Sequence, residues 1–148
     1  MPIEVPNYIS KIDPYQGGKP IKEVAREIGI PEEKIIKLAS NENPMGISPF
    51  AKKAINDASS EIHRYPDGNG YYLKEALSKK FLLDTRQIII GNGSNDILEL
   101  AARTFVSKGE QVLYSEHAFA VYKIVSQAVG GEGIEAHSDN YSHNLDAF

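Results

Sequence analysis

The chain has 148 residues, a net charge of −4 and no cysteine. The length fits one domain of ordinary size, and the hydrophobic fraction of 41% and charged fraction of 24% are near globular norms. No basic tract stands out and no apolar run approaches the length of a membrane span, so we expect neither nucleic acid nor a membrane as partner. The absence of cysteine excludes disulfides, and residues 1–5 do not resemble a signal peptide. We therefore expect a cytoplasmic protein.

The first third of the chain is rich in helix breakers. Residues 1–20 carry four prolines and two adjacent glycines, which predicts an extended arm that docks on another part of the protein. A short helix is expected over Ile21–Ile28, ended by Gly29. The apolar run Ile35–Leu38 could form a short strand.

Turn residues dominate the next segment, Ser40–Gly46, which includes Asn43 before a proline. Ser48 is a candidate N-cap for a helix that has proline at its first position and runs to about Ser60. A second loop follows at Tyr65–Gly70.

From Tyr72 onward, helical and strand patterns alternate, which is typical of a parallel sheet flanked by helices. Strands are expected at Gln87–Ile90, Gln111–Ser115 and Ile134–His137, and helices at Tyr72–Leu83, Asn95–Val106 and Phe119–Val129. A helix is expected to begin at Asn144–Phe148. Because a sheet of three strands leaves unpaired edges, the pattern indicates a truncated α/β domain.

The segment Ile88–Ile90 followed by Gly91-Asn92-Gly93 predicts a strand, a tight turn and a helix N-terminus. Free amide groups and the helix dipole at such an N-terminus favour a phosphate, and Ser94 and Asn95 can donate further hydrogen bonds. Two alternatives remain open. One is that Ser94 or Asn95 is an ordinary N-cap, and the other is that the glycines only form a tight turn. The dinucleotide pattern is not met, since Asp96 stands where a third glycine belongs, and no P-loop lysine follows.

Four motifs occur in order along the chain. They are Pro14-Tyr15-Gln16-Gly17-Gly18-Lys19-Pro20, Leu38-Ala39-Ser40-Asn41-Glu42-Asn43-Pro44, Arg64-Tyr65-Pro66-Asp67 and Gly91-Asn92-Gly93-Ser94-Asn95-Asp96. Together they resemble the N-terminal part of histidinol-phosphate aminotransferase. The resemblance implies the PLP-dependent transferase fold of type I, a three-layer α/β/α structure with a mostly parallel sheet, preceded by an arm and small-domain helices. It also implies pyridoxal 5′-phosphate as cofactor.

The resemblance assigns cofactor roles to several residues. Ser94, Asn95 and the backbone of Gly93 match positions that bind the cofactor phosphate. Phe119 matches the aromatic residue that stacks on the pyridine ring, and its alternative is a place in an apolar core. Tyr65 matches a tyrosine that reaches the cofactor phosphate of the other subunit, and its alternative is plain packing in a loop.

Two further residues match substrate-binding positions. Tyr15 and Asn43 lie near the substrate in the family, with the arm contributed by a partner chain. The alternatives are that Tyr15 only fastens the arm and that Asn43 only forms a turn. The resemblance thus implies a homodimer in which Tyr65 and the arm cross the interface.

The activity implied is transamination between histidinol phosphate and 2-oxoglutarate in histidine biosynthesis. Threonine-phosphate decarboxylase and aromatic amino-acid aminotransferases of the same fold remain alternatives, as does a non-catalytic remnant that binds phosphate or a partner. The family's Schiff-base lysine lies beyond this chain, which we expect to be inactive alone. We expect an arm and short helix at residues 1–35, a small-domain segment and linker at 36–66, and an incomplete cofactor domain at 67–148.

The four histidines show no spacing typical of metal ligands, so no metal site is expected. His137 and His143 fall in a polar segment and are expected to be solvated.

Overall fold

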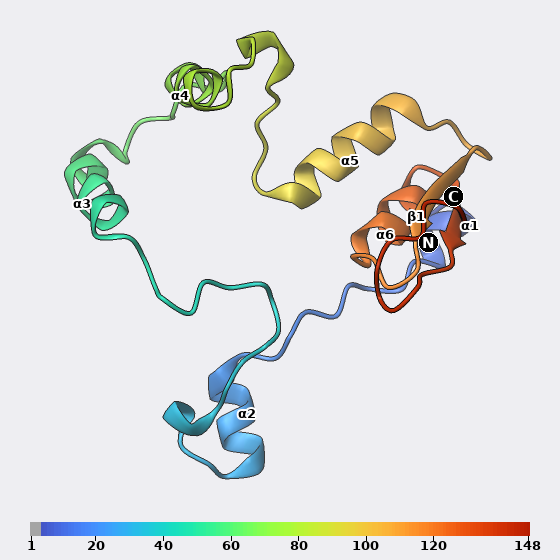
Figure 1. The fold of residues 1–148 in the computed structure, drawn as a ribbon, viewed down its shortest axis with the longest axis horizontal. Helices are drawn as coiled ribbons and strands as arrows, with labels where there is room; N and C mark the ends of the chain where they lie inside the picture. The colour runs from blue at the N-terminus through green and yellow to red at the C-terminus, as the bar shows by residue number, and fades with distance from the viewer. Residues whose placement is uncertain (1–3) are drawn as a thin grey trace. The chain divides into compact units, whose positions relative to one another are not determined.

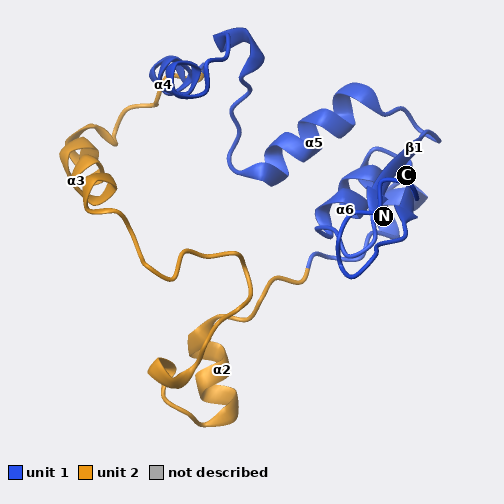
Figure 2. Ribbon diagram, in the orientation of Figure 1, with its two compact units in different colours: residues 1–15, 69–148 blue, residues 16–68 orange. Residues whose placement is uncertain are grey.

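The computed structural model describes residues 4–148, so the start of the predicted arm, including Pro2, lies outside the described residues. The chain divides into two compact units (Figure 2). One consists of residues 1–15 and 69–148, and the other of residues 16–68. The predicted divisions after residues 35 and 66 stay a prediction.

Short helices make up most of the regular structure (Figure 1). The α-helices are α1 (Asn7–Ser10), α2 (Ile21–Ile28), α3 (Pro49–Ala58), α4 (Tyr71–Phe81), α5 (Ser94–Phe105) and α6 (Val121–Ala128), the 3-10 turns are η1 (Glu32–Lys34), η2 (Ser59–Glu61) and η3 (Thr85–Gln87), and the strands are β1 (Gln111–Ser115) and β2 (Glu132–Ala136). Within residues 4–148, no helix is long and apolar enough to cross a bilayer.

The best-packed part of the first unit is the β1–α6–β2 segment. The two strands pair in parallel, with Gln111 opposite Glu132 and Ser115 opposite Ala136. Helix α6 contacts both strands and also α1 and α5. Val121 at its first position is 5% exposed, and burial of such apolar side chains against the strands is the main stabilising contribution here. The predicted parallel βαβ arrangement is confirmed for this pair of strands.

A glycine makes room for the largest buried side chain of this segment. Tyr114 on β1 is buried, and a Cβ built on Gly133 of β2 would lie 2.6 Å from its hydroxyl oxygen. The same ring stacks on Tyr122 of α6, with ring centroids 6.2 Å apart. Burial raises the pKa of Tyr114. Gly133 therefore lets an aromatic ring lie across the neighbouring strand.

The second unit, residues 16–68, is built around α2 and α3. Helix α2 spans the predicted residues and ends at Gly29, whose φ of 72° lies in the left-handed region. Helix α3 has Pro49 at its first position as predicted, but Ser48 makes no side-chain capping bond. Helix formation was therefore predicted correctly here, and the capping bond of Ser48 was not.

Two predicted strands are absent from the described structure. Residues 35–38 form no ladder, and Ile36 and Leu38 are 85% and 93% exposed. At 87–90, where a strand was expected, Gln87 instead ends η3, around which Asp84 and Gln87 form a capping box, and residues 88–90 pair with no strand. Apolar residues alone do not make a strand, since each strand needs a neighbour that accepts and donates hydrogen bonds. The sheet described here therefore has two strands rather than three.

The ends of the chain also differ from expectation. The arm contains the one-turn helix α1, which contacts α6, so its predicted docking is confirmed although it is not wholly extended. Residues 144–148 form a turn rather than a helix, and the side-chain oxygen of Asn144 accepts a hydrogen bond from the amide of Ala147 at 3.0 Å. Side-chain acceptors of this type compete with helical hydrogen bonds.

Candidate cofactor site

The turn before α5 has the features of an anion site. Gly93 occupies the N-cap position with φ 87° and ψ 175°, a conformation that favours glycine, and no side chain caps the helix. Ser94 and Asn95 are exposed residues of its first turn, so neither is the N-cap that the alternative interpretation required. A Cβ built on Gly93 would meet no atom within 4 Å. The space over this turn is therefore open to a ligand.

Asp96 supports the turn from within. Its carboxylate accepts a hydrogen bond from the amide of Asn92 at 3.0 Å, and a Cβ on Gly91 would lie 2.9 Å from its oxygen. The acidic side chain thus bonds backward into the turn. The absence of a side chain on Gly91 permits this close approach.

Phe119 lies between β1 and α6 and is 41% exposed. Its ring contacts the ring of Tyr15 edge-on, with centroids 5.8 Å apart and an interplanar angle of 80°. Edge-to-face pairs of this kind are favourable because the ring edge is positive and the face negative. Tyr15 and Phe119, assigned to substrate and cofactor, are therefore brought together within one chain.

The turn that carries Phe119 is bonded to the segment after β2. The carboxylate of Glu116 contacts Nδ1 of His137 at 2.8 Å and accepts a hydrogen bond from the amide of Ser138 at 3.1 Å. The hydroxyl of Ser138 donates to the carbonyl of Glu116 at 2.7 Å. The hydrogen bond from the amide of Ser138, and after it the contact with His137, hold the pKa of Glu116 below its usual range. Partial desolvation acts in the opposite direction and raises this pKa.

Sequence reasoning missed this group of residues. His137 was expected to be solvated, and its side chain is indeed 74% exposed, but it also contacts Glu116 across 21 positions of sequence. The available signal was the parallel strand pairing, which predicts that residues following two neighbouring strands lie at the same sheet edge. No group of three acidic or histidine residues within residues 4–148 could hold a metal ion.

Tyr65 and Asn43 lie in the other unit. Tyr65 is fully exposed at the side of an open hollow that Ile62 and Pro66 also line. Asn43 forms a turn, in which its side-chain oxygen accepts from the amide of Met45 at 3.0 Å and its nitrogen donates to the carbonyl of Gly46 at 2.9 Å. The structure therefore places Asn43 in the turn that the alternative interpretation described.

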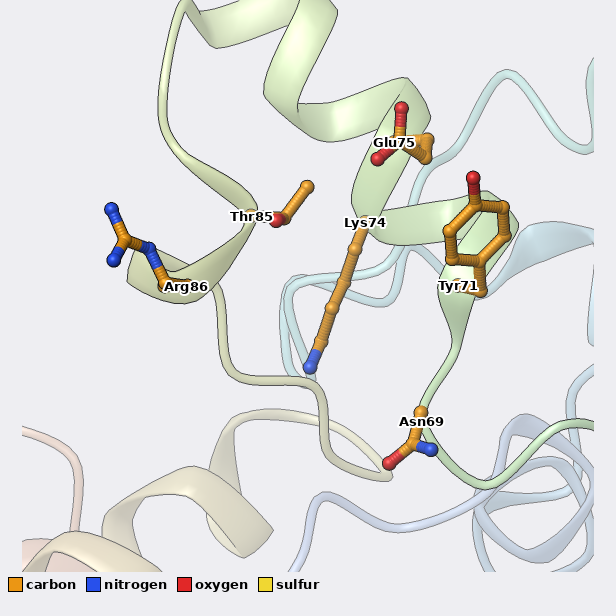
Figure 3. A pocket seen from close by; sticks show the side chains of 6 residues that line it. All are labelled: Asn69, Tyr71, Lys74, Glu75, Thr85 and Arg86. Carbon is orange, nitrogen blue, oxygen red and sulfur yellow. The ribbon is translucent and has the colours of Figure 1, made fainter.

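A separate hollow of about 270 Å³ lies beside α4 and η3 (Figure 3). Its lining residues are Asn69, Tyr71, Lys74, Glu75, Thr85 and Arg86. The guanidinium of Arg86 forms an ion pair with the carboxylate of Asp84 at 2.9 Å. None of the residues predicted for the site lines this hollow, and we place the candidate site at the α5 and α6 N-termini.

Solved structures of PLP-dependent enzymes resemble this chain in fold. A histidinol-phosphate aminotransferase from Sinorhizobium meliloti, solved in complex with pyridoxal-5′-phosphate, matches 95% of the chain with a TM-score of 0.78 and 23% identity. An aminotransferase from Escherichia coli matches 99% of it with a TM-score of 0.72. The chain covers 37% and 39% of those two structures. Its fold is therefore that of a segment of the type I PLP-dependent aminotransferases.

Sequence relatives narrow the class. Histidinol-phosphate aminotransferase 2 of Nitrosospira multiformis is 57% identical over 96% of the chain, and the enzyme of Methylobacillus flagellatus is 54% identical over the same share. The chain spans 36% and 39% of the length of these curated relatives. No family model matches it. The predicted resemblance to histidinol-phosphate aminotransferases is therefore confirmed, over a little more than a third of their length.

Proposed function

We propose that the protein to which this segment corresponds is a PLP-dependent aminotransferase acting on histidinol phosphate and 2-oxoglutarate in histidine biosynthesis. The observation that carries the proposal is 57% identity, over 96% of the chain, to a protein of that name. The same name on the second relative favours this activity over a threonine-phosphate decarboxylase or an aromatic amino-acid aminotransferase.

The residues present fit the cofactor. The glycine N-cap of α5 leaves its first turn without a side-chain cap, and the exposed hydroxyl of Ser94 and amide of Asn95 lie beside it. A doubly charged phosphate is favoured at such a terminus by both the amides and the helix dipole. We assign Gly93, Ser94 and Asn95 to the phosphate.

Phe119 offers a partly exposed aromatic face to the pyridine ring. Stacking restricts the tilt of a bound ring, while the phosphate contacts hold its far end. When bound, pyridoxal phosphate supplies the electron sink for transamination. In this proposal, the segment's own residues hold and orient the cofactor.

Asn43 and Tyr65 keep the roles that the resemblance implies, and Tyr15 keeps its place near the substrate, although here it contacts Phe119 of its own chain and not that of a partner. We propose that Tyr15 and Asn43 lie near the substrate and that Tyr65 crosses a homodimer interface to the cofactor phosphate. Full exposure of the Tyr65 ring supports its availability to a second subunit. Replacing Tyr65 by phenylalanine in the whole enzyme is expected to weaken cofactor retention without dissociating the dimer, as measured by dialysis and sedimentation. Unchanged cofactor retention would contradict this role.

The cofactor assignment is tested with the chain itself. Pyridoxamine 5′-phosphate carries the ring and phosphate but no aldehyde, so it does not react with surface lysines. We expect saturable binding by fluorescence titration, weakened about tenfold in Ser94→Ala because one hydrogen bond to a charged group is lost. Ser60→Ala, an exposed serine of the other unit, is the matched control. Equal affinity in wild type and Ser94→Ala would refute the phosphate role of Ser94.

A further inference from the structure

The position of Phe119 depends on a short turn between β1 and α6. The amide of Ala118 donates to the carbonyl of Ser115 at 3.1 Å, and the amide of Tyr122 donates to the carbonyl of Phe119 at 3.0 Å. His117 within the turn has φ 60°, a left-handed conformation that costs a non-glycine residue energy and needs support from its surroundings. What holds this turn therefore decides where the ring lies.

Glu116 supplies that support through both its backbone and its side chain. Its amide donates to the carbonyl of Ala136 at 2.7 Å. Glu116 directly follows Ser115, which forms the last pair of the two strands with Ala136. Its carbonyl accepts from the hydroxyl of Ser138, which is buried. Its carboxylate accepts a hydrogen bond from the amide of Ser138 and contacts the imidazole of His137. One residue thus connects the turn at four points, one of them to Ala136 at the end of β2 and three to the two residues that follow it.

We propose that Glu116 is a positioning residue for Phe119, fixing the β1–α6 turn against His137 and Ser138 so that the ring can stack on the cofactor. The inference rests on the proposed function, because it assigns Phe119 to the pyridine ring. Glu116 itself touches neither phosphate nor ring in this assignment, and acts only through the turn.

The charge of Glu116 suits this task. The carboxylate has one imidazole at 2.8 Å, from His137, and a second at 3.8 Å, from His117. Charge-assisted hydrogen bonds are shorter and stronger than neutral ones, so an ionised Glu116 fixes the turn better than a neutral isostere. Glutamine at this position keeps an oxygen that accepts from Ser138 but loses the charge.

The test compares two ligands on the full chain. In this proposal, binding of pyridoxamine 5′-phosphate depends on both the α5 turn and the ring of Phe119, whereas binding of inorganic phosphate depends only on the α5 turn. In Glu116→Ala we expect the affinity for pyridoxamine 5′-phosphate to fall about three- to tenfold, the range of an aromatic pair, with phosphate affinity unchanged. Glu116→Gln is expected to lie between, and Glu99→Ala, which removes a glutamate bonded to Arg103 on α5, is the control that changes neither.

Hydrogen exchange of residues 116–122 is the second readout, and it does not depend on a ligand. Glu116→Ala is expected to speed exchange there and to leave α5 unchanged. Unaltered pyridoxamine 5′-phosphate affinity, or a parallel loss of both ligands, would overturn the positioning role. If the wild-type chain binds no pyridoxamine 5′-phosphate, the assignment of the α5 turn and Phe119 to the cofactor fails. Unchanged exchange in Glu116→Ala would separately refute the proposal that Glu116 fixes the turn.

Discussion

The ring of Tyr15 meets the ring of Phe119 edge-on at a centroid distance of 5.8 Å. Tyr15 follows the one-turn helix of the arm, and Phe119 precedes α6, so this pair joins the start of the chain to the candidate cofactor site. Both rings remain partly exposed, at 53% and 41%. The contact therefore fastens the arm while leaving part of the Phe119 ring accessible.

Removal of the Tyr15 ring is expected to loosen the arm. In Tyr15→Ala, trypsin cleavage after Lys11 should accelerate about two- to tenfold, since an aromatic pair contributes roughly 0.5–1.5 kcal/mol. Tyr72→Ala breaks a comparable edge-on pair with Tyr71 on α4 and serves as control. Equal cleavage rates after Lys11 in both variants would show that the Tyr15–Phe119 contact does not hold the arm.

Gly93→Ala is expected to disturb the phosphate turn through the backbone alone. The φ of 87° is strained for alanine by about 1–3 kcal/mol, whereas a Cβ would meet no neighbouring atom. Urea unfolding should show this loss, and inorganic phosphate should bind more weakly. Gly68→Ala, where a Cβ also meets nothing and φ is not positive, should leave both measurements near wild type. A Gly93→Ala chain as stable as Gly68→Ala would contradict the strain argument.

The ionisation of Glu116 predicts a pH dependence of stability. Because its contacts hold the pKa of the folded state below the ordinary 4.5, the stabilisation is fully present above 4.5 and is lost as pH falls through the lower folded value. The difference in melting temperature between wild type and Glu116→Gln should therefore shrink as the pH falls below 4.5. Asp84, whose pKa is lowered by Arg86, titrates in both proteins and cancels in the difference. A difference that persists unchanged into acid would rule out this contribution.

Gly133→Val is expected to destabilise the β1–α6–β2 segment by about 1–3 kcal/mol, the usual cost of overpacking. The new side chain would overlap the ring of Tyr114, and this ring also stacks on Tyr122 of helix α6. Glu135→Val changes an exposed residue of the same strand and should shift urea unfolding by far less. Similar midpoints for the two variants would mean that Tyr114 moves aside at little cost.

Local sequence signals predicted the helices well. The predicted bounds of α2 and β1 agree with the structure residue for residue. Gly29 marks the end of α2, and β1 is an apolar run bounded by turns. Residues 35–38 and 87–90 carry the same apolar signal as β1 but form no strand. A strand depends on a partner elsewhere in the chain, and single-sequence patterns do not contain that information.

The sequence likewise predicted the local features of the candidate site but not its contacts between distant residues. The turn at Gly93 and Ser94 follows from glycine chemistry and helix electrostatics, which are local. The contact of Glu116 with His137 joins residues that share no motif, and only the register of two parallel strands brings them together. The roles of Ser94, Phe119 and Tyr65 stay predictions until the binding measurements above are made.

The parallel pairing of β1 with β2 has a consequence for the order of folding. Glu116 and His137 are separated by 21 positions, so the turn beneath Phe119 closes through contacts within one short stretch of chain. The Tyr15–Phe119 contact closes a far longer loop, and the entropic cost of closure grows with loop length. Short loops close first when rates follow contact order. The support for the cofactor ring would thus assemble early, and the arm would dock on it as a late step.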